Sequence, residues 1–334
     1  MKAMVLAAGL GTRLRPITYS VPKPMVPILN RPVMEHIVKL LAGQGFTGII
    51  ANLHWFPDTI KDHFGDGSDF GVDLSYSYEE DLLGTAGGVY AAREFFDGSF
   101  LVISGDALTD VDLVAMKEFH KSHEGIATLA TKEVEDTSEF GVVITEEGGR
   151  IQGFQEKPDP AEALSNLANC GIYMFDREIF DFFPEPGTSK LAAPGHPAGF
   201  ADWALDVFPA LMESGVPFFA HEVDAYWNDV GTIGEFLQGS FDGLTGAVDL
   251  GIEEPEVEPG IWVAENVSLD GVEVTGPVLI GPGTTIGKGA KLTGPLVIGA
   301  ACELGEEAKV KEAVLLDGTN VSAGAFAFGG VLGG

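Results

Sequence analysis

The chain has 334 residues, of which 50 are Asp or Glu and 19 are Lys or Arg, so its formal net charge is −31. This acidity argues against nucleic acid or an anionic membrane surface as a partner, because both would repel the chain. Apolar residues make up 45% of the sequence, which is typical of a globular protein and excludes a disordered one. The sequence predicts no membrane span, since it has no run of 18 apolar residues.

The two cysteines, Cys170 and Cys302, lie far apart in the sequence. We therefore expect reduced thiols rather than a disulfide, as is usual in a cytoplasmic protein. An apolar, strand-like run begins near the N-terminus and leaves no room for a signal peptide. These features together predict a cytoplasmic location.

The first fifty residues form a positive segment in this acidic chain. They contain six basic residues and one acid, a net charge of +5, whereas the other 284 residues contain 13 basic and 49 acidic ones, a net charge of −36. Within this segment an apolar run leads into a glycine-rich turn, Gly9–Arg15, and Lys23 follows between two prolines. Backbone amides, arginines and a lysine on a stiffened loop favour a polyphosphate ligand. The turn matches neither the dinucleotide fingerprint nor the Walker motif, so a purely structural turn stays an alternative.

Strand and helix patterns alternate over residues 1–245. The predicted strands are Met4–Ala8, Gly48–Asn52, Val72–Tyr78, Phe100–Ser104, Gly125–Ala130 and Pro217–Glu222. Asn30 before Arg31-Pro32 predicts the start of a helix, and an apolar stripe predicts another helix over residues 203–211. Residues 184–200, rich in proline and glycine, are expected to form a mobile surface loop. Such alternation predicts an α/β domain with a mostly parallel sheet, whose ligands bind at the C-terminal ends of the strands.

A different pattern begins near residue 250. Aliphatic residues recur at every sixth position: Val274, Ile280, Ile286, Leu292, Ile298, Leu304, Val310 and Leu316. This hexapeptide period predicts a short left-handed parallel β-helix over residues 251–334, following a first domain at residues 1–245. The register of the repeat is expected to slip near Val321.

Seven short motifs follow one another over residues 1–240. They are Gly9–Arg13 with Pro22-Lys23-Pro24, Leu83–Gly87, Gly105-Asp106, Glu139–Gly141, Glu156-Lys157-Pro158, Asn169–Tyr173 and Trp227–Thr232. This ordered set resembles that of the sugar-1-phosphate nucleotidyltransferases, and within them it is most similar to the mannose-1-phosphate guanylyltransferases. The resemblance implies a Rossmann-like nucleotidyltransferase domain that uses a nucleoside triphosphate and a sugar 1-phosphate and releases pyrophosphate.

The resemblance also implies roles for individual residues. Asp106 and Asp229 match the family's metal positions, which makes Mg²⁺ the expected cofactor, and Arg13 and Lys23 match cations that face the triphosphate. These four are the expected catalytic residues. The expected nucleotide-binding residues are Leu6, Ala8, Gly9, Gly11, Thr12, Arg13, Gly84, Thr85 and Gly87. The expected sugar-phosphate-binding residues are Gly141, Glu156, Lys157 and Asn169.

The base preference is predicted from Gly87. Thymidylyl-transferring relatives have a glutamine at this position, and we interpret the glycine as room for a purine. GTP and mannose 1-phosphate are therefore the preferred substrates, giving GDP-mannose. Glucose 1-phosphate with dTTP or UTP is the first alternative, and a catalytically silent homologue that only binds a nucleotide-sugar is the second.

Other polar residues are expected to have structural roles. His120 and His123 are three positions apart on a predicted helix without an evident third ligand, so a solvated face is expected. Asp110 and Asp112 are expected to be helix-cap or surface residues. No histidine follows His221, so the repeats lack the base of a hexapeptide acyltransferase. They are expected to serve in assembly or regulation, and we expect a homo-oligomer joined through residues 251–334.

Overall fold

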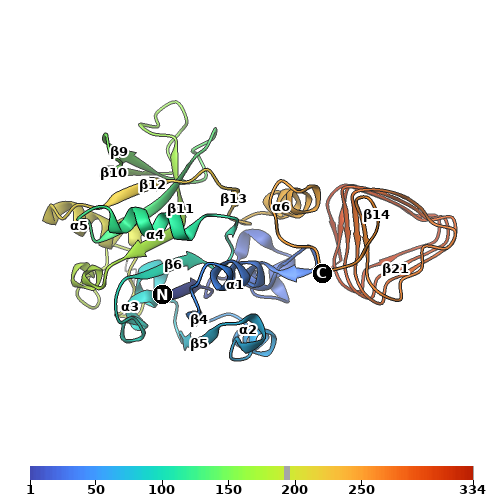
Figure 1. Ribbon diagram of the computed structural model, residues 1–334, viewed down its shortest axis with the longest axis horizontal. Helices are drawn as coiled ribbons and strands as arrows, with labels where there is room; N and C mark the ends of the chain where they lie inside the picture. Colours follow the sequence, from blue (N-terminus) through green and yellow to red (C-terminus); the bar gives the residue numbers. More distant parts are fainter. Residues whose placement is uncertain (192–195, 334) are drawn as a thin grey trace. The chain divides into compact units, whose positions relative to one another are not determined.

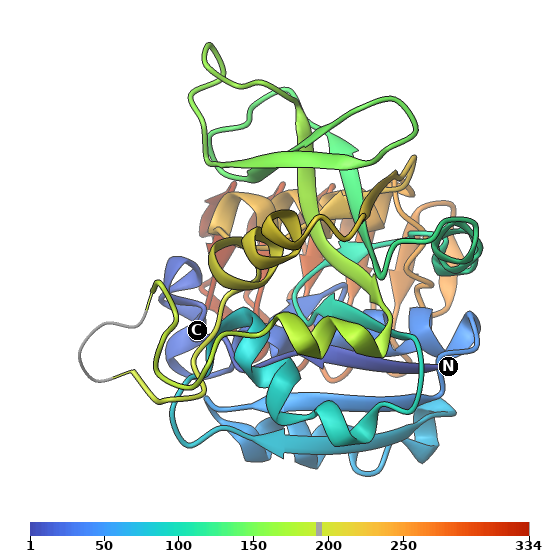
Figure 2. The ribbon, with the colours of Figure 1, turned by 90° about the vertical axis from the view of Figure 1, so that its left-hand side faces the viewer.

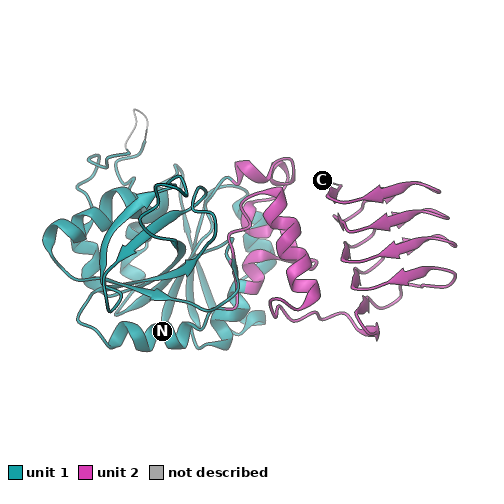
Figure 3. Cartoon of the chain, turned by 90° about the horizontal axis from the view of Figure 1, so that it is seen from above, with its two compact units in different colours: residues 1–10, 37–107, 111–227 teal, residues 11–36, 108–110, 228–334 magenta. Residues whose placement is uncertain are grey.

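The computed structural model describes residues 1–191 and 196–333 of the chain. They form two compact units, drawn in teal and magenta in Figure 3. The first unit contains residues 1–10, 37–107 and 111–227, and the second contains residues 11–36, 108–110 and 228–334. Residues 11–15 of the glycine-rich turn and Lys23 thus group with the C-terminal repeats, although the sequence pattern divides the chain at residues 245–251. Residues 192–195, within the expected loop 184–200, lie outside the described residues.

A nine-stranded sheet lies in the described part of the first unit. Its main path is β10 (Ile151–Glu156), β9 (Gly141–Thr145), β11 (Leu167–Phe175), β6 (Phe100–Ser104), β1 (Lys2–Leu6), β4 (Gly48–Leu53) and β5 (Asp73–Tyr78), while β8 (Ala127–Glu133) pairs with β11 and β12 (Phe219–Glu222) with β8. The pairings make seven of these strands parallel to one another, with β10 and β11 opposed. The predicted mostly parallel sheet is confirmed, and Figure 2 shows the green strands β9 and β10 at the side away from the blue strands β4 and β5.

The central strands are apolar because the sheet is covered. Met4 in β1 and Val102 in β6 are fully buried and belong to one apolar cluster with Phe175 in β11. Strands buried on both faces have such continuous apolar runs rather than alternating ones. The helices are α1 (Val33–Gly43), α2 (Pro57–Phe64), α3 (Gly84–Ala91), α4 (Leu113–Lys121), α5 (Phe208–Ser214) and α6 (Ile233–Thr245). Across the described residues, none of the helices is long and apolar enough to cross a membrane.

One of the two predicted helix starts was wrong, and the other has the expected start but a different helix type. Asn30 does not cap α1: with Leu29 it forms the turn between β2 (Pro27–Ile28) and β3 (Arg31–Pro32). Leu29 and Asn30 have φ angles of 49° and 63°, the left-handed pair that a two-residue hairpin turn requires. The helix predicted from residue 203 begins as a π-helix, Trp203–Val207, which continues into α5.

The C-terminal strands stack in three parallel sheets, whose coils are seen end-on in Figure 1. After β14 (Glu256–Glu258), the first sheet contains β15 (Ile261–Val263), β17 (Val278–Ile280), β20 (Leu296–Ile298), β23 (Val314–Leu315) and β26 (Val331–Leu332). The second contains β16 (Glu273–Thr275), β19 (Lys291–Thr293), β22 (Lys309–Lys311) and β25 (Phe326–Phe328), and the third β18 (Thr285–Ile286), β21 (Glu303–Leu304) and β24 (Asn320–Val321). Val274 pairs with Leu292 and Ile280 with Ile298, so three hexapeptides complete one coil.

The repeat loses one residue between Lys311 and Val314. Ile298 pairs with Leu315 and Leu304 with Val321, each a step of 17 residues rather than 18. The inward residue is therefore Leu315, which belongs to the apolar cluster of the repeats, and not Leu316, as the uninterrupted period predicts. The slip precedes Val314, earlier than expected. Cys302 is buried in this cluster, and both cysteines are free thiols, as predicted.

His120 and His123 belong to a hydrogen-bond chain in the interior. His120 is 4% exposed, so the expected solvated face is wrong. The hydroxyl of Thr128 lies 2.8 Å from Nδ1 of His120 and 2.9 Å from Nε2 of His123. The Gly125 amide donates to Nδ1 of His123. Because His123 accepts at Nδ1, its neutral form donates from Nε2 to Thr128, whose own hydrogen is then donated to His120. Both rings fill these roles in their neutral form, in which the remaining hydrogen of His120 is on Nε2, 3.4 Å from Asp176 Oδ1.

We predict that this network makes the fold sensitive to acid. Burial lowers the pKa of His120, while burial and then the charge of His120 lower the pKa of His123. The folded state thus disfavours protonation of these histidines. The free energy of unfolding is therefore unaffected above the unfolded pKa of about 6.5 and falls as the pH decreases below it. The decrease is at most about 1.4 kcal/mol per pH unit for each histidine. Urea unfolding between pH 7.5 and 5.0 should show a smaller loss for His120→Leu than for the parent chain. The exposed His196 provides the control His196→Gln, and equal slopes for all three would contradict the prediction.

Candidate active site

The glycine-rich turn of the second unit brings Lys23 against Gly11. Gly11 has a φ of +60°, a left-handed conformation that favours glycine. A Cβ atom at this residue would lie 2.9 Å from Cβ of Lys23 and 3.0 Å from Cγ2 of Thr18. The Thr18 hydroxyl also donates to the Gly11 carbonyl at 2.7 Å. Glycine is therefore required here so that the stem of Lys23 can cross the turn.

Arg13 and Lys23 both approach Asp229. Lys23 Nζ donates to the backbone carbonyl of Asp229 at 3.1 Å, and Arg13 Nη2 lies 3.9 Å from Asp229 Oδ2. The side chains of Arg13 and Asp229 remain 50% and 29% exposed, so both can meet a ligand. Three of the four predicted catalytic residues thus lie together in the second unit, whereas Asp106 belongs to the first.

Backbone strain follows directly after Asp229. Val230 has a φ of +39°, which is rare for a β-branched residue and costs of order 1–3 kcal/mol. Its amide donates to Asn228 Oδ1 at 2.8 Å, and the Gly231 amide donates to Glu235 Oε2 at 3.0 Å. Thr232 caps α6 by accepting from the Glu235 amide. These bonds hold the strained turn and so fix the direction in which Asp229 leaves the backbone.

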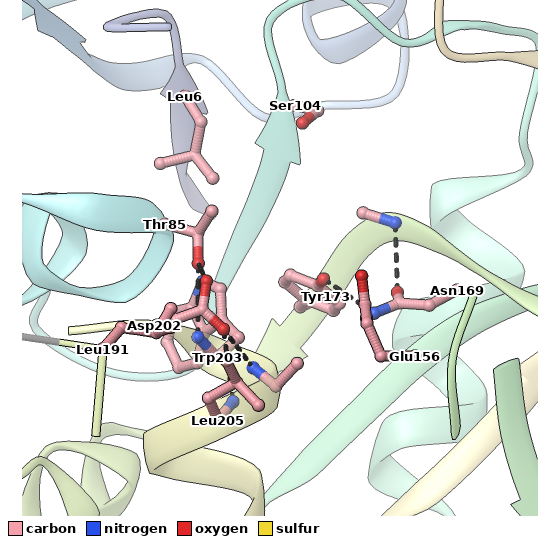
Figure 4. A pocket seen from close by; sticks show the side chains of 12 residues that line it. Leu6, Thr85, Ser104, Glu156, Asn169, Tyr173, Leu191, Asp202, Trp203 and Leu205 are labelled. Carbon is pink, nitrogen blue, oxygen red and sulfur yellow. Dashed lines mark hydrogen bonds between the residues drawn. The ribbon is translucent and has the colours of Figure 1, made fainter. Parts of the chain in front are cut away.

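A cavity of about 310 Å³ lies in the first unit, at the C-terminal ends of β1 and β6. This is the edge of the sheet at which α/β proteins bind ligands. Figure 4 shows its side chains converging from several elements. The lining residues are Leu6, Thr85, Ser104, Glu156, Asn169, Gly171, Tyr173, Leu191, Asp202, Trp203, Ala204 and Leu205.

One wall of this cavity carries oxygen and amide groups. The pairing of β9 with β10 places Glu156 opposite Gly141, and a Cβ at Gly141 would lie 3.1 Å from Glu156 Oε2. Asn169 on β11 donates to Tyr173 Oη at 3.0 Å and accepts from the Gly171 amide at 3.1 Å, which fixes its side chain (Figure 4). A carboxylate and a held amide on one wall suit a ligand with several hydroxyl groups.

Lys157 and Asp106 lie at turns that follow strands. Lys157 has a φ of +45°, and its amide donates to the carbonyl of Phe140 at 3.1 Å. Strain at an exposed lysine is typical of a functional position. Asp106 follows β6 after Gly105, whose amide donates to the carbonyl of Leu6 at 2.8 Å. A Cβ at Gly105 would lie 2.7 Å from that carbonyl oxygen, so glycine allows the close approach that precedes Asp106.

The start of α3 binds another part of the chain. The amides of Ala86 and Gly87 donate to the carbonyl of Ala201 at 3.0 and 3.1 Å. A Cβ at Gly87 would lie 2.4 Å from the carbonyl oxygen of Gly199. The interpretation of Gly87 as room for a purine is therefore wrong, because protein backbone fills that space. Gly84, at a φ of +78°, is similarly close to Ala201.

Sequence reasoning missed the wall formed by residues 202–205. Thr85 Oγ1 donates to Asp202 Oδ2 at 2.8 Å, and Asp202 also caps the π-helix that begins at Trp203. Buried Asp206 accepts hydrogen bonds from Ser189 Oγ and from the amide of Asp202. No motif pointed to these residues, because they reach the cavity only through the hydrogen bonds that join residues 202–206 to Thr85 and Ser189.

Comparisons with known proteins agree with this fold. The family described as nucleotidyl transferase matches residues 2–245. A UTP–glucose-1-phosphate uridylyltransferase of Synechocystis sp. is 41% identical over 86% of this chain and 76% of its own length. A mannose-1-phosphate guanylyltransferase of Mycobacterium tuberculosis is 33% identical over 96% of this chain and 81% of its own. A crystal structure of a candidate glucose-1-phosphate thymidylyltransferase from Bacillus anthracis, with sucrose, is 25% identical, covers 75% of this chain and 97% of that one, and has a TM-score of 0.64.

The family match covers most of the chain, and the fold is of the α/β type with a cavity at the strand ends. The protein is therefore an enzyme of nucleotidyl transfer. The chain belongs to the nucleotidyl transferase family. Its homologues carry the names of sugar-1-phosphate guanylyl- and uridylyltransferases.

Proposed function

We propose that the chain joins a sugar 1-phosphate to the α-phosphorus of a nucleoside triphosphate, with mannose 1-phosphate and GTP as the substrates. The convergence of Arg13 and Lys23 on Asp229, next to a turn that needs Gly11, is the observation that carries the proposed reaction. The substrate pair is supported by the Mycobacterium tuberculosis relative, which is 33% identical over 96% of this chain and carries the name mannose-1-phosphate guanylyltransferase. The cations offset the charge of the triphosphate, and the cavity with Glu156 and Asn169 provides the sugar-binding groups.

The reaction forms one phosphorus–oxygen bond and breaks another. An oxygen of the sugar phosphate attacks the α-phosphorus, and pyrophosphate leaves with the bonding electrons. The protein has to align the two substrates and offset negative charge, since little covalent chemistry falls to its side chains. Lys23 acts as a point charge toward the triphosphate and Arg13 as a planar fork, while Lys157 binds the phosphate of the sugar.

Mg²⁺ is the cofactor we propose. The ion keeps several waters and takes one or two carboxylates together with phosphate oxygens. Asp106 and Asp229 offer such carboxylates, each in a turn next to a regular element, and Asp229 is partly exposed. When bound, the ion would offset charge on the transferring phosphate.

UTP with glucose 1-phosphate is the second candidate pair. The Synechocystis relative, which is 41% identical, carries the name of this activity. The packing of Gly87 against Gly199 also removes the argument for a purine from that residue. A silent homologue is disfavoured because Arg13, Lys23, Asp106 and Asp229 are all present.

The proposal includes the organisation of the chain. Residues 1–245 form the nucleotidyltransferase domain, in agreement with the family match at residues 2–245. Residues 251–334 form a left-handed parallel β-helix, supported by parallel pairings at steps of 17 or 18 residues. Phe326 and Phe328 are 67% and 58% exposed on its last coil, which supports a homo-oligomer joined through this region.

We predict that Asp106→Asn and Asp229→Asn each slow turnover by about 100-fold or more while leaving the fold intact, because each removes a metal-binding charge. Excess EDTA should abolish activity, and added Mg²⁺ should restore it. Pyrophosphate release measures each rate, with Asp110→Asn as the matched control near Asp106. Full activity in EDTA, or equal loss in the control, would contradict the assignment.

The substrate pair is tested by a matrix of GTP, UTP, dTTP, ATP and CTP against mannose, glucose, galactose and N-acetylglucosamine 1-phosphates. We expect the highest kcat/KM for GTP with mannose 1-phosphate, measured as pyrophosphate release. A maximum at UTP with glucose 1-phosphate would establish the second candidate. Absence of release with every pair would reject catalysis.

A further inference from the structure

We propose that the C-terminal repeats position Lys23 for the nucleoside triphosphate through the β2–β3 hairpin, with Asn30 as the positioning residue. The proposal rests on the proposed function, since it assigns Lys23 to the triphosphate. It also gives the repeats a role in the reaction although they contain no histidine. Every contact in the argument lies within the second unit.

The tip of the hairpin is attached to the repeats. Asn30 Nδ2 donates to the carbonyl of Ile298, in strand β20, at 2.9 Å. Arg31 Nη2 lies 2.8 Å from Glu253 Oε2 in the segment before the repeats, and its Nη1 lies 3.2 Å from buried Glu35 Oε1. Two adjacent residues of the hairpin therefore bind the C-terminal part of the chain, one by a neutral hydrogen bond and one by charge.

The base of the hairpin is attached to the cations. Lys23 is four residues before β2, and the amide of Val26 donates to the carbonyl of Lys23 at 3.1 Å. The amide of Val33, after β3, donates to the carbonyl of Val26 at 3.0 Å and closes this segment into a loop. A shift of the hairpin is therefore transmitted to Lys23 through a short, hydrogen-bonded path.

Helix α6 forms a second connection along the same route. Its N-terminus follows Asp229, the residue that Lys23 and Arg13 approach, and the helix contacts strand β20. A Cβ at Gly243 would lie 3.0 Å from Leu29 Cδ1, and one at Gly239 would lie 3.7 Å from Ile28 Cδ1. Gly243 thus lets the hairpin approach the helix closely, and Gly239 lies at ordinary contact distance from it. The repeats and α6 thus both contact the hairpin, which in turn contacts the segment Lys23–Met25.

Asn30 permits a test that leaves the backbone conformation alone. Its φ of 63° is one that glycine adopts without strain, so Asn30→Gly removes the side-chain hydrogen bond and keeps the turn. The repeats provide a matched control, Asn266→Gly, at an exposed residue with a φ of 67°. Glu253→Gln weakens the ion pair with Arg31 at its exposed partner. This variant replaces Asn30→Gly in the test if Asn30→Gly fails to fold.

The experiment measures kinetics and amide hydrogen exchange. For Asn30→Gly we expect the KM for the nucleoside triphosphate to rise about three- to fivefold, as loss of one hydrogen bond that holds a charged group allows. The kcat and the KM for the sugar 1-phosphate should stay within about twofold of the parent values. In the absence of substrate, hydrogen exchange at the Val26 and Val33 amides should be faster in Asn30→Gly than in the parent chain. Asn266→Gly should match the parent in every measurement.

An unchanged KM for the triphosphate together with unchanged exchange would overturn the proposal. Equal increases in the KM of both substrates would also overturn it, because a structural role alone produces that result. If the parent chain releases no pyrophosphate with any substrate pair, the proposed function fails, while exchange at Val26 and Val33 still decides whether Asn30 holds the segment.

Discussion

The close contact between Gly11 and Lys23 is the constraint on which the candidate site depends. The chain is strongly acidic, so a cation near an anionic ligand has many competing carboxylates around it. The missing Cβ at Gly11 lets the lysine stem cross the turn, and the ammonium group then reaches the backbone carbonyl of Asp229. A rigidly placed cation loses little conformational freedom when a ligand binds, which favours binding of a polyphosphate.

The two compact units divide the predicted functional groups. The second unit carries Arg13, Lys23 and Asp229, which suit phosphate groups and a metal ion, and the first carries Asp106 and the cavity with Glu156 and Asn169. Each set lies beside a residue with a positive φ angle, which costs stability: Val230 follows Asp229, and Lys157 follows Glu156. Such strain persists where surrounding hydrogen bonds over-determine the backbone, as the bonds from Val230 to Asn228 and from Lys157 to Phe140 do.

Much of the fold could be predicted from the sequence because its signals are local and periodic. The apolar run of β6 reflects a strand that is buried on both faces of the sheet. The six-residue period reflects one inward-facing residue on each side of the coil. Asn30 was misassigned because asparagine favours both helix caps and left-handed turns, and only the pairing of Ile28 with Arg31 decides between them. His120 was misassigned because its partner, Thr128, is on a neighbouring strand. Gly87 was misread for the same reason: residues 199–201, which fill the space beside it, are distant in the sequence. Trp203 begins a predicted helix, but no motif marks Asp202 or Trp203 as residues that line the cavity.

Calorimetric titration of inorganic tripolyphosphate with Mg²⁺ tests directly whether Gly11 places Lys23 to bind polyphosphate, without reference to base or sugar. Gly11→Ala keeps every charge but puts a Cβ where Lys23 packs, and Gly98→Ala adds the same atom in open space. We expect the Kd of Gly11→Ala to rise about tenfold, the loss of about 1.4 kcal/mol that a displaced charge-assisted contact allows, and the Kd of Gly98→Ala to equal that of the parent. A folded Gly11→Ala variant that binds tripolyphosphate as tightly as the parent would contradict the claim.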